Sequence, residues 1–332
     1  MNPRLPLESK TTSKTTSNCK IKPMTGEIEP ASPASIVIRS ERLVAEISPH
    51  GAELTRLRDR DGNDLLWNGC EKWWTGRAPL LFPIVGALPS NTAVVDGKTF
   101  SMRQHGFARN KQFSVVGARL SECTFGLASD DETRRQFPFD FVLEVTFVIE
   151  GAALRIGATV VNKSSRAMPV SFGFHPAFRW PLPYGGSRQD HEIRFERPES
   201  APIRRLTDGL LDLTASKEMF EGSIMALDDA MFVPGALIFD RLQSRAVSFG
   251  VPGEPSIQIR FPNMPHLGVW TKPGAGFLCV EPWQGYAAPL GFVGELKDKP
   301  GGMLLAASAS TEFAIEICLL GTNEPSTRSL GL

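Results

Sequence analysis

Three segments of the chain place ionisable side chains beside apolar residues, glycines and prolines. They are residues 103–109 (RQHGFAR), 172–178 (FGFHPAF) and 277–285 (FLCVEPWQG), and they carry His105, His175 and Glu281. A carboxylate carried into the interior must find partners, because an unpaired buried charge is very costly. Ionisable groups in such surroundings are candidates for a functional site. A carboxylate and an imidazole suit general acid–base chemistry near neutral pH.

Four motifs follow one another along the chain. They are residues 76–86 (GRAPLLFPIVG), 105–109 (HGFAR), 173–178 (GFHPAF) and 281–283 (EPW). In this order and spacing they resemble the aldose 1-epimerase (galactose mutarotase-like) superfamily, in particular the branch that includes the LacX-type proteins and, more distantly, the hexose-6-phosphate 1-epimerases. The likeness extends over roughly residues 36–320. It implies a β-supersandwich fold and an isomerase that interconverts the α and β anomers of an aldose without a metal or an organic cofactor.

The resemblance also implies roles for the central residues. Opening a pyranose ring needs one base at the C1 hydroxyl and one acid at the ring oxygen. By resemblance, Glu281 is the base at O1 and His175 is the acid at O5, and the two roles reverse when the ring closes again. His105 matches the second histidine of the family, which would hydrogen-bond near O5 and stabilise the open-chain carbonyl.

Further candidates for substrate binding follow from the same resemblance. Arg109 matches an arginine that the phosphosugar branch uses for substrate anions, and Arg77 is a candidate for either a substrate-facing or a structural role. Guanidinium groups suit phosphates or paired hydroxyls. Trp283, beside the base, and also Trp270 could stack on the apolar face of a sugar.

One position departs from the family pattern. We expect an aspartate at the start of the apolar segment 235–239 (GALIF), where it would fix sugar hydroxyls, but Gly235 stands there. Asp229 or Asp240 could substitute, although strand geometry puts Asp240 roughly 15 Å or more from that position. Residues 285–289 (GYAAP) also lack an acidic residue that the family pattern leads us to expect. The identity of the sugar therefore stays open.

Other functions and structural roles remain possible. A non-catalytic carbohydrate-binding or sensor domain on the same fold is the alternative, because a site without the aspartate can still hold a sugar. A glycoside hydrolase needs a second carboxylate about 5–9 Å from the first, and no second acidic residue stands in a motif like that of Glu281. Taken singly, His175 could be a hydrogen-bonded core histidine and His105 could form a salt-bridged turn with Arg109.

The elements that must position these residues are mostly strands. Residues 141–149 and 154–161 alternate apolar and polar side chains around Glu150 and Gly151, which predicts a β-hairpin with one buried face. Similar short segments recur along the chain, and 30 glycines with 26 prolines suit many tight turns. We predict an all-β fold, a large antiparallel β-sandwich with few short helices. Residues 206–220 could hold one such helix.

Composition argues against a protein that binds nucleic acid or a membrane. The 332 residues contain 36 Lys and Arg against 36 Asp and Glu, so the basic field that binds nucleic acid or anionic membranes is missing. No apolar run reaches the ~18–20 residues of a spanning helix. We expect a single catalytic domain at 36–322, tails at 1–35 and 323–332 of which the first is disordered, and a monomer or homodimer.

Cysteines and the remaining histidines give no sign of a metal site. The five cysteines are an odd number without a CxxC pair, which favours a reducing cytoplasm over a disulfide framework. Cys279 is expected in the core. His50, His191 and His266 show no metal-ligand spacing and are assigned to the surface. The expected partner is a monosaccharide or a sugar phosphate.

Overall fold

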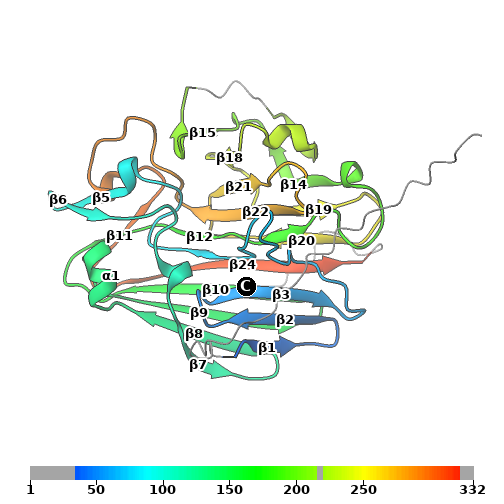
Figure 1. Ribbon diagram of the computed structural model, residues 1–332, viewed down its shortest axis with the longest axis horizontal. Coiled ribbons are helices and arrows are strands. Elements are labelled where there is room, and N and C mark those ends of the chain that lie inside the picture. The colour runs from blue at the N-terminus through cyan, green and yellow to red at the C-terminus, as the bar shows by residue number, and fades with distance from the viewer. Residues whose placement is uncertain (1–33, 215–219, 322–332) are drawn as a thin grey trace, which may run out of the picture. The chain divides into compact units, whose positions relative to one another are not determined.

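Antiparallel strands make up most of the regular structure, as the sequence predicted (Figure 1). The computed structural model describes residues 34–214 and 220–321. The expected tails at 1–35 and 323–332 therefore lie outside the described residues, apart from residues 34 and 35. Within those ranges no helix has the length and apolar character needed to cross a membrane.

The larger sheet has nine strands. Figure 1 shows the part of it from β7 through β8, β9 and β10 to β24 side by side. In spatial order they are β17 (Gly222–Ala226), β14 (Glu192–Glu199), β19 (Ala246–Gly250), β20 (Ser256–Arg260), β24 (Ser310–Leu320), β10 (Ala153–Asn162), β9 (Phe141–Glu150), β8 (Glu122–Ala128) and β7 (Ser114–Ala118). The predicted hairpin is β9 and β10. In its first arm, buried side chains alternate with more exposed ones, as predicted. The buried residues are Phe141, Leu143, Val145, Phe147 and Ile149.

The second sheet has six strands and carries the site. Along its main path they are β18 (Leu237–Phe239), β21 (His266–Trp270), β22 (Phe277–Gln284), β12 (Phe172–Phe174) and β4 (Leu80–Leu81), and β13 (Ala177–Arg179) also pairs with β22. Its inner face packs on the nine-stranded sheet. Phe172 of β12 stacks on Phe313 of β24 with ring centroids 5.2 Å apart, and Phe239 of β18 contacts Phe195 of β14 at 5.3 Å. The two sheets therefore form the predicted sandwich.

Smaller elements complete the described structure. The short sheets consist of β1 (Ile36–Arg39), β2 (Leu43–Ser48) and β3 (Glu53–Asp59), of β5 (Thr92–Val95) with β6 (Lys98–Ser101), of β11 (Met168–Val170) with β23 (Met303–Leu305), and of β15 (Arg205–Thr207) with β16 (Leu210–Asp212). The helical elements are α1 (Asp131–Gln136) and the 3-10 turns η1 (Pro89–Asn91), η2 (Ala108–Asn110), η3 (Arg188–Asp190), η4 (Asp229–Phe232) and η5 (Leu296–Asp298).

The helix considered for residues 206–220 is wrong. This stretch contains the hairpin of β15 and β16, while residues 215–219 lie outside the described ranges. Asp208 and Gly209 both have positive φ (51° and 79°), as a tight two-residue hairpin turn requires. The preference of Asp208 and Gly209 for a hairpin turn therefore outweighs the helix-like spacing of the leucines in this segment.

Candidate active site

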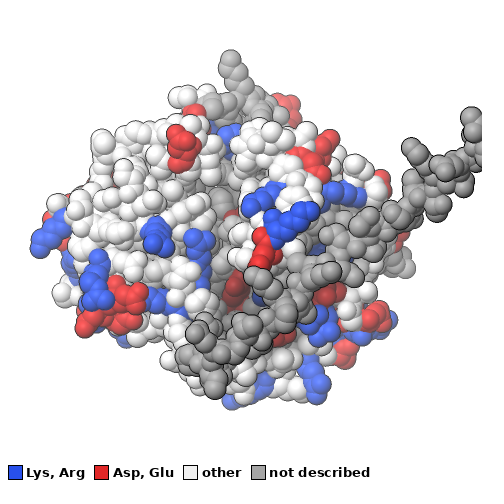
Figure 2. Space-filling model, viewed as in Figure 1, with Lys and Arg blue, Asp and Glu red and all other residues white. Residues whose placement is uncertain are grey.

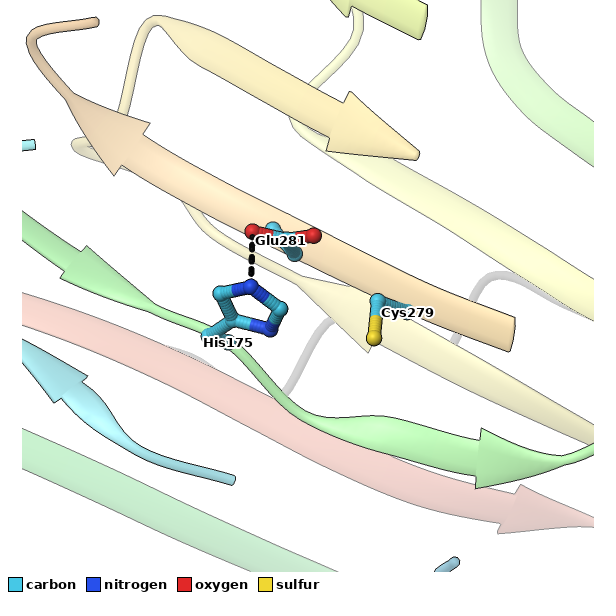
Figure 3. A group of neighbouring side chains, drawn as sticks. All are labelled: His175, Cys279 and Glu281. Carbon is cyan, nitrogen blue, oxygen red and sulfur yellow. Dashed lines mark ion pairs between the residues drawn. The ribbon is translucent and has the colours of Figure 1, made fainter. Parts of the chain in front are cut away.

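Sheet register brings His175 and Glu281 together. Gly173 of β12 pairs with Trp283 of β22, and Ala177 of β13 pairs with Cys279 of the same strand. This places His175, which lies between β12 and β13, opposite Glu281 on the outer face of the six-stranded sheet. Nε2 of His175 lies 3.0 Å from Oε2 of Glu281 (Figure 3). The two predicted catalytic residues are thus neighbours, although 106 positions separate them in sequence.

Burial dominates the electrostatics of this pair. Glu281 is only 2 % exposed and His175 only 7 %. Burial raises the pKa of Glu281 well above its usual range, and the nearby indole of Trp283 acts in the opposite direction. Burial, together with the positive charge of Arg109, lowers the pKa of His175 to about 3. Both directions disfavour separated charges, so the pair is suited to hold one shared proton near neutral pH.

An aromatic wall stands on one side of the pair. The ring of Trp74 lies 5.0 Å from the imidazole of His175, and that of Trp270 lies 6.1 Å from it. Trp74 and Trp270 meet edge to face at 5.5 Å and both contact Phe277. Both tryptophans are partly exposed. The sequence interpretation named Trp270 but missed Trp74, which lies in an irregular loop without any periodic pattern.

Trp283 lies flat on the sheet beside Glu281. A Cβ on Gly173 would come within 2.6 Å of its Cδ1 atom, and a Cβ on Gly268 within 2.4 Å of its Cη2 atom. The indole therefore occupies the space that these two glycines leave open across β12, β22 and β21. Leu211 of β16 and Ile238 of β18 belong to the same apolar cluster, and Trp283 is only 5 % exposed.

His105 is held beside His175 by backbone contacts. Its φ of +67° is unusual for a residue with a side chain, and its N–H donates to the carbonyl of Gly86 (2.9 Å). In return the N–H of Gly86 donates to Nδ1 of His105 (3.1 Å), which places the proton of a neutral ring on Nε2. The rings of His105 and His175 are 5.8 Å apart. Burial, followed by the charges of His175 and Arg109, lowers the pKa of His105 well below its usual range.

The two predicted arginines differ in their surroundings. Arg109 lies four residues after His105, in the middle of η2, and its Nη2 donates to the carbonyl of Gln104 (3.0 Å). Burial lowers the pKa of Arg109, while the charge of Glu53 opposes this shift. Arg77 directs its Nη2 to the carbonyl of Asn68 (3.0 Å). Only Arg109 acts electrostatically on both histidines.

Glu53 anchors the loop that carries Arg77. Its Oε1 accepts hydrogen bonds from the backbone N–H groups of Arg77 (2.7 Å) and Ala78 (2.9 Å). The carbonyl of Arg77 in turn accepts from the N–H of Ala177 (2.8 Å), two residues after His175. The motif at residues 76–86 therefore runs beside the predicted acid.

Arginines bind both aspartates that were considered as substitutes at Gly235. Asp229 receives two hydrogen bonds from Arg188, at 2.9 and 2.8 Å. Asp240 accepts from Nε of Arg204 (3.3 Å), and its other oxygen is buried without a hydrogen-bond partner among the described residues. Gly235 itself has a φ of +97°, which favours glycine.

Two of the three histidines assigned to the surface are buried. His50 is exposed, as predicted, whereas His191 and His266 are not. His191 accepts a hydrogen bond from the N–H of Leu182 at Nε2 (3.0 Å) and contacts the carbonyl of Ser187 through Nδ1 (2.9 Å). The surface prediction was wrong because these backbone partners come from turns that the local sequence does not reveal.

Cys279 shares the outer face with the acid–base pair. Its Sγ, a ring nitrogen of His175 and a carboxylate oxygen of Glu281 all lie within 4.8 Å of one another (Figure 3). Burial and the charge of Glu281 raise the pKa of the Cys279 thiol well above its usual range. The residue is buried, as predicted, but it lies beside the site rather than in the main core.

Comparison with known proteins agrees with this geometry. The aldose 1-epimerase family model matches residues 34–295. The chromosomal LacX protein of Lactococcus lactis subsp. lactis is 31 % identical over 277 residues, which are 80 % of this chain and 93 % of that protein.

Solved structures show the same likeness. A galactose mutarotase related enzyme from Lactobacillus acidophilus superposes with a TM-score of 0.79 at 29 % identity, over 87 % of this chain and 98 % of that one. A galactose mutarotase-like protein from Lactobacillus casei gives a TM-score of 0.78 at 29 % identity, over 86 % and 100 % of the two chains. The family match and the LacX similarity establish that this chain belongs to the aldose 1-epimerase family.

Proposed function

We propose that this chain is an aldose 1-epimerase, which interconverts the α and β anomers of a hexose or a related sugar. The observation that carries the proposal is the contact between His175 and Glu281 at 3.0 Å on one buried face. The reaction consumes no proton overall, because one is taken from the C1 hydroxyl and one is given to the ring oxygen. A pair that shares one proton meets this requirement.

Burial favours the shared proton on Glu281, so the proposed reaction begins when the bound sugar draws this proton to His175, which leaves Glu281 as carboxylate and His175 as imidazolium. Glu281 takes the proton from O1 while His175 gives its proton to O5, and the C1–O5 bond breaks as the C1 carbonyl forms. Rotation about C1–C2 presents the other face of the carbonyl to O5. His175 then takes the O5 proton and Glu281 returns one to the new C1 hydroxyl, so the starting protonation state is restored.

Neighbouring groups support this assignment. The neutral ring of His105 has its proton on Nε2, which lies 3.2 Å from the side-chain amide of Gln104. A sugar that displaces this amide would receive the Nε2 proton near O5. The positive charge of Arg109 close to both histidines favours a substrate with an anionic group. The partly exposed rings of Trp74 and Trp270 offer an apolar surface for a sugar face, while Trp283 would take part through its edge beside Glu281.

The wider setting belongs to the same proposal. The substrate is a monosaccharide or sugar phosphate, and the chain acts in the cytoplasm as a monomer or homodimer. Among the described cysteines, Cys123 and Cys279 are free thiols. Acidic and basic residues are interspersed over the face in Figure 2, which agrees with a partner that is neither nucleic acid nor membrane.

A second candidate is a sugar-binding sensor on the same fold. Gly235 favours it, because a Cβ at this position would meet nothing within 4 Å. The position of the expected aspartate is therefore unfilled. Without that carboxylate the sugar hydroxyls are bound more weakly, but the site is not blocked.

Polarimetry and exchange NMR on freshly dissolved α-glucose, α-galactose and their 6-phosphates test the proposal. We expect the wild-type chain to accelerate anomerisation, and Glu281→Gln and His175→Asn each to lower the rate ~10²-fold or more. Glu199→Gln is the matched control, since Glu199 is equally buried but lies on β14 of the nine-stranded sheet, where it accepts hydrogen bonds from the backbone N–H groups of Gln243 and Ser244. Variants as fast as wild type would refute the assignment. Sugar binding without anomerisation would support the sensor.

A further inference from the structure

Cys279 has no part in the proposed proton transfers, yet it lies against both groups that carry them. Residues 279 and 281 are two apart on one strand, so their side chains project from the same face. His175 joins them from the neighbouring chain segment (Figure 3). All three side chains are more than nine-tenths buried. Nδ1 of His175 has no hydrogen-bond partner among the described residues, although it is shielded from solvent.

We propose that His175, Cys279 and Glu281 form a binding site for a thiophilic divalent cation of the Zn²⁺ class. A thiolate, an imidazole and a carboxylate are the three kinds of ligand that zinc takes in proteins. Cations that prefer an all-oxygen shell, such as Mg²⁺ and Ca²⁺, do not suit a site with sulfur and nitrogen. Three protein ligands leave a fourth position of a tetrahedral ion for water or a sugar hydroxyl.

The observed spacing fits one ion. Ligand atoms about 2.0–2.3 Å from a tetrahedral zinc ion are roughly 3.3–3.8 Å from one another. Nε2 of His175 and Oε2 of Glu281 are 3.0 Å apart, and the three candidate ligand atoms lie within 4.8 Å. Small rotations of the side chains therefore bring all three to bonding distance. Among the described residues, no other group of three histidine, cysteine, aspartate or glutamate side chains comes together in this way.

Occupation of the site removes the groups on which the proposed reaction depends. The ion takes lone pairs of Glu281, His175 and the Cys279 thiolate. Two protons are released to solvent, one from the thiol of Cys279 and one that the acid–base pair had shared. Neither group can then exchange a proton with O1 or O5. The cation is therefore a reversible inhibitor. This consequence rests on the proposed function, whereas binding itself does not.

Titration of the full chain with Co²⁺ tests binding directly. We expect one equivalent to produce the visible bands of a tetrahedral ion and a thiolate-to-cobalt charge-transfer band in the near ultraviolet. Both should disappear when Zn²⁺ is added in competition. Cys279→Ala should lose the charge-transfer band, and Cys318→Ser should keep it, because Cys318 lies on β24 of the other sheet. Absence of the band in wild type, or its persistence in Cys279→Ala, would overturn the proposal whether or not the chain anomerises sugars.

Inhibition provides the second readout. We expect Zn²⁺ to stop anomerisation by the wild type, a chelator to restore it, and Cys279→Ala to need roughly tenfold more Zn²⁺ or higher for the same inhibition. The rate of this variant without metal should stay within about threefold of wild type, since the thiol transfers no proton. Circular dichroism checks its fold, and Cys279→Ser replaces it if alanine destabilises the chain. Equal zinc sensitivity of wild type and a folded variant at position 279 would contradict the inference.

Discussion

Replacing Gly268 by alanine puts a methyl group where the ring of Trp283 lies. The new Cβ would be 2.4 Å from Cη2 and 2.5 Å from Cζ2 of the indole, closer than any real contact. Forcing extra volume into a packed site costs about 1–3 kcal/mol of stability. Gly268 also pairs directly with Glu281 in the register of β21 and β22. A displaced ring therefore moves the proposed base, and we expect the anomerisation rate to fall about tenfold or more.

Gly157→Ala is the matched control, because Gly157 lies inside β10 and its Cβ would meet only the mobile end of Glu312, at 3.4 Å. We expect its unfolding free energy to change by less than about 0.5 kcal/mol. Urea denaturation gives the unfolding free energy of both variants, and polarimetry under native conditions gives their anomerisation rates. Trp283→Phe should relieve the clash, so that Gly268→Ala costs about 1 kcal/mol less in that background. Equal costs for both glycines, or no coupling with Trp283, would refute the described position of the indole.

Three further predictions concern single side chains. Arg109→Ala should impair a sugar 6-phosphate at least tenfold more in kcat/KM than the free sugar, and equal losses would remove the phosphate role. Trp74→Ala should raise KM several-fold while Trp73→Ala does not, which steady-state kinetics on both variants would show. Burial lowers the pKa of Lys299 to about 7 in the folded chain, against ~10.4 for an unperturbed lysine. Between pH 7 and 10 the unfolded chain therefore binds more protons than the folded chain, and the free energy of unfolding rises with pH by a few kcal/mol. Lys299→Met should flatten this rise in denaturation at pH 7 to 10, whereas Lys297→Met, at an exposed lysine, should not.

Local patterns predicted those parts of the fold that depend on local physics. The alternation in β9 and β10 follows from one buried face, and it can be read without knowledge of any partner. The hairpin at Asp208 and Gly209 was equally local, but the spacing of Leu206, Leu210 and Leu211 suits a helix as well as a strand. The Asp-Gly turn decides between them, because two consecutive residues with positive φ cannot lie within a helix.

The site depended on resemblance for its residues and on the structure for its geometry. The motifs singled out His175 and Glu281, but their contact depends on register between segments more than 100 positions apart in sequence. No local pattern reports that register. Trp74 was missed for a related reason, since its role arises from a loop folded over β13 and β22 rather than from its neighbours in sequence. Burial of His266 likewise depends on Tyr286, whose ring lies 4.9 Å away.

Burial links the proposed chemistry to the proposed metal sensitivity. The apolar clusters on either side of the pair, one around Phe277 and Trp67 and the other around Trp283, keep water away from Glu281 and His175. The same exclusion shifts both pKa values toward a single shared proton, which ring opening requires. A buried site lined by nitrogen and oxygen lone pairs already resembles a metal site, and one thiol on the same strand face completes its ligand set. An apolar side chain at position 279 would offer no ligand to a metal, so the thiol of Cys279 is what makes the proposed acid–base pair open to inhibition by zinc.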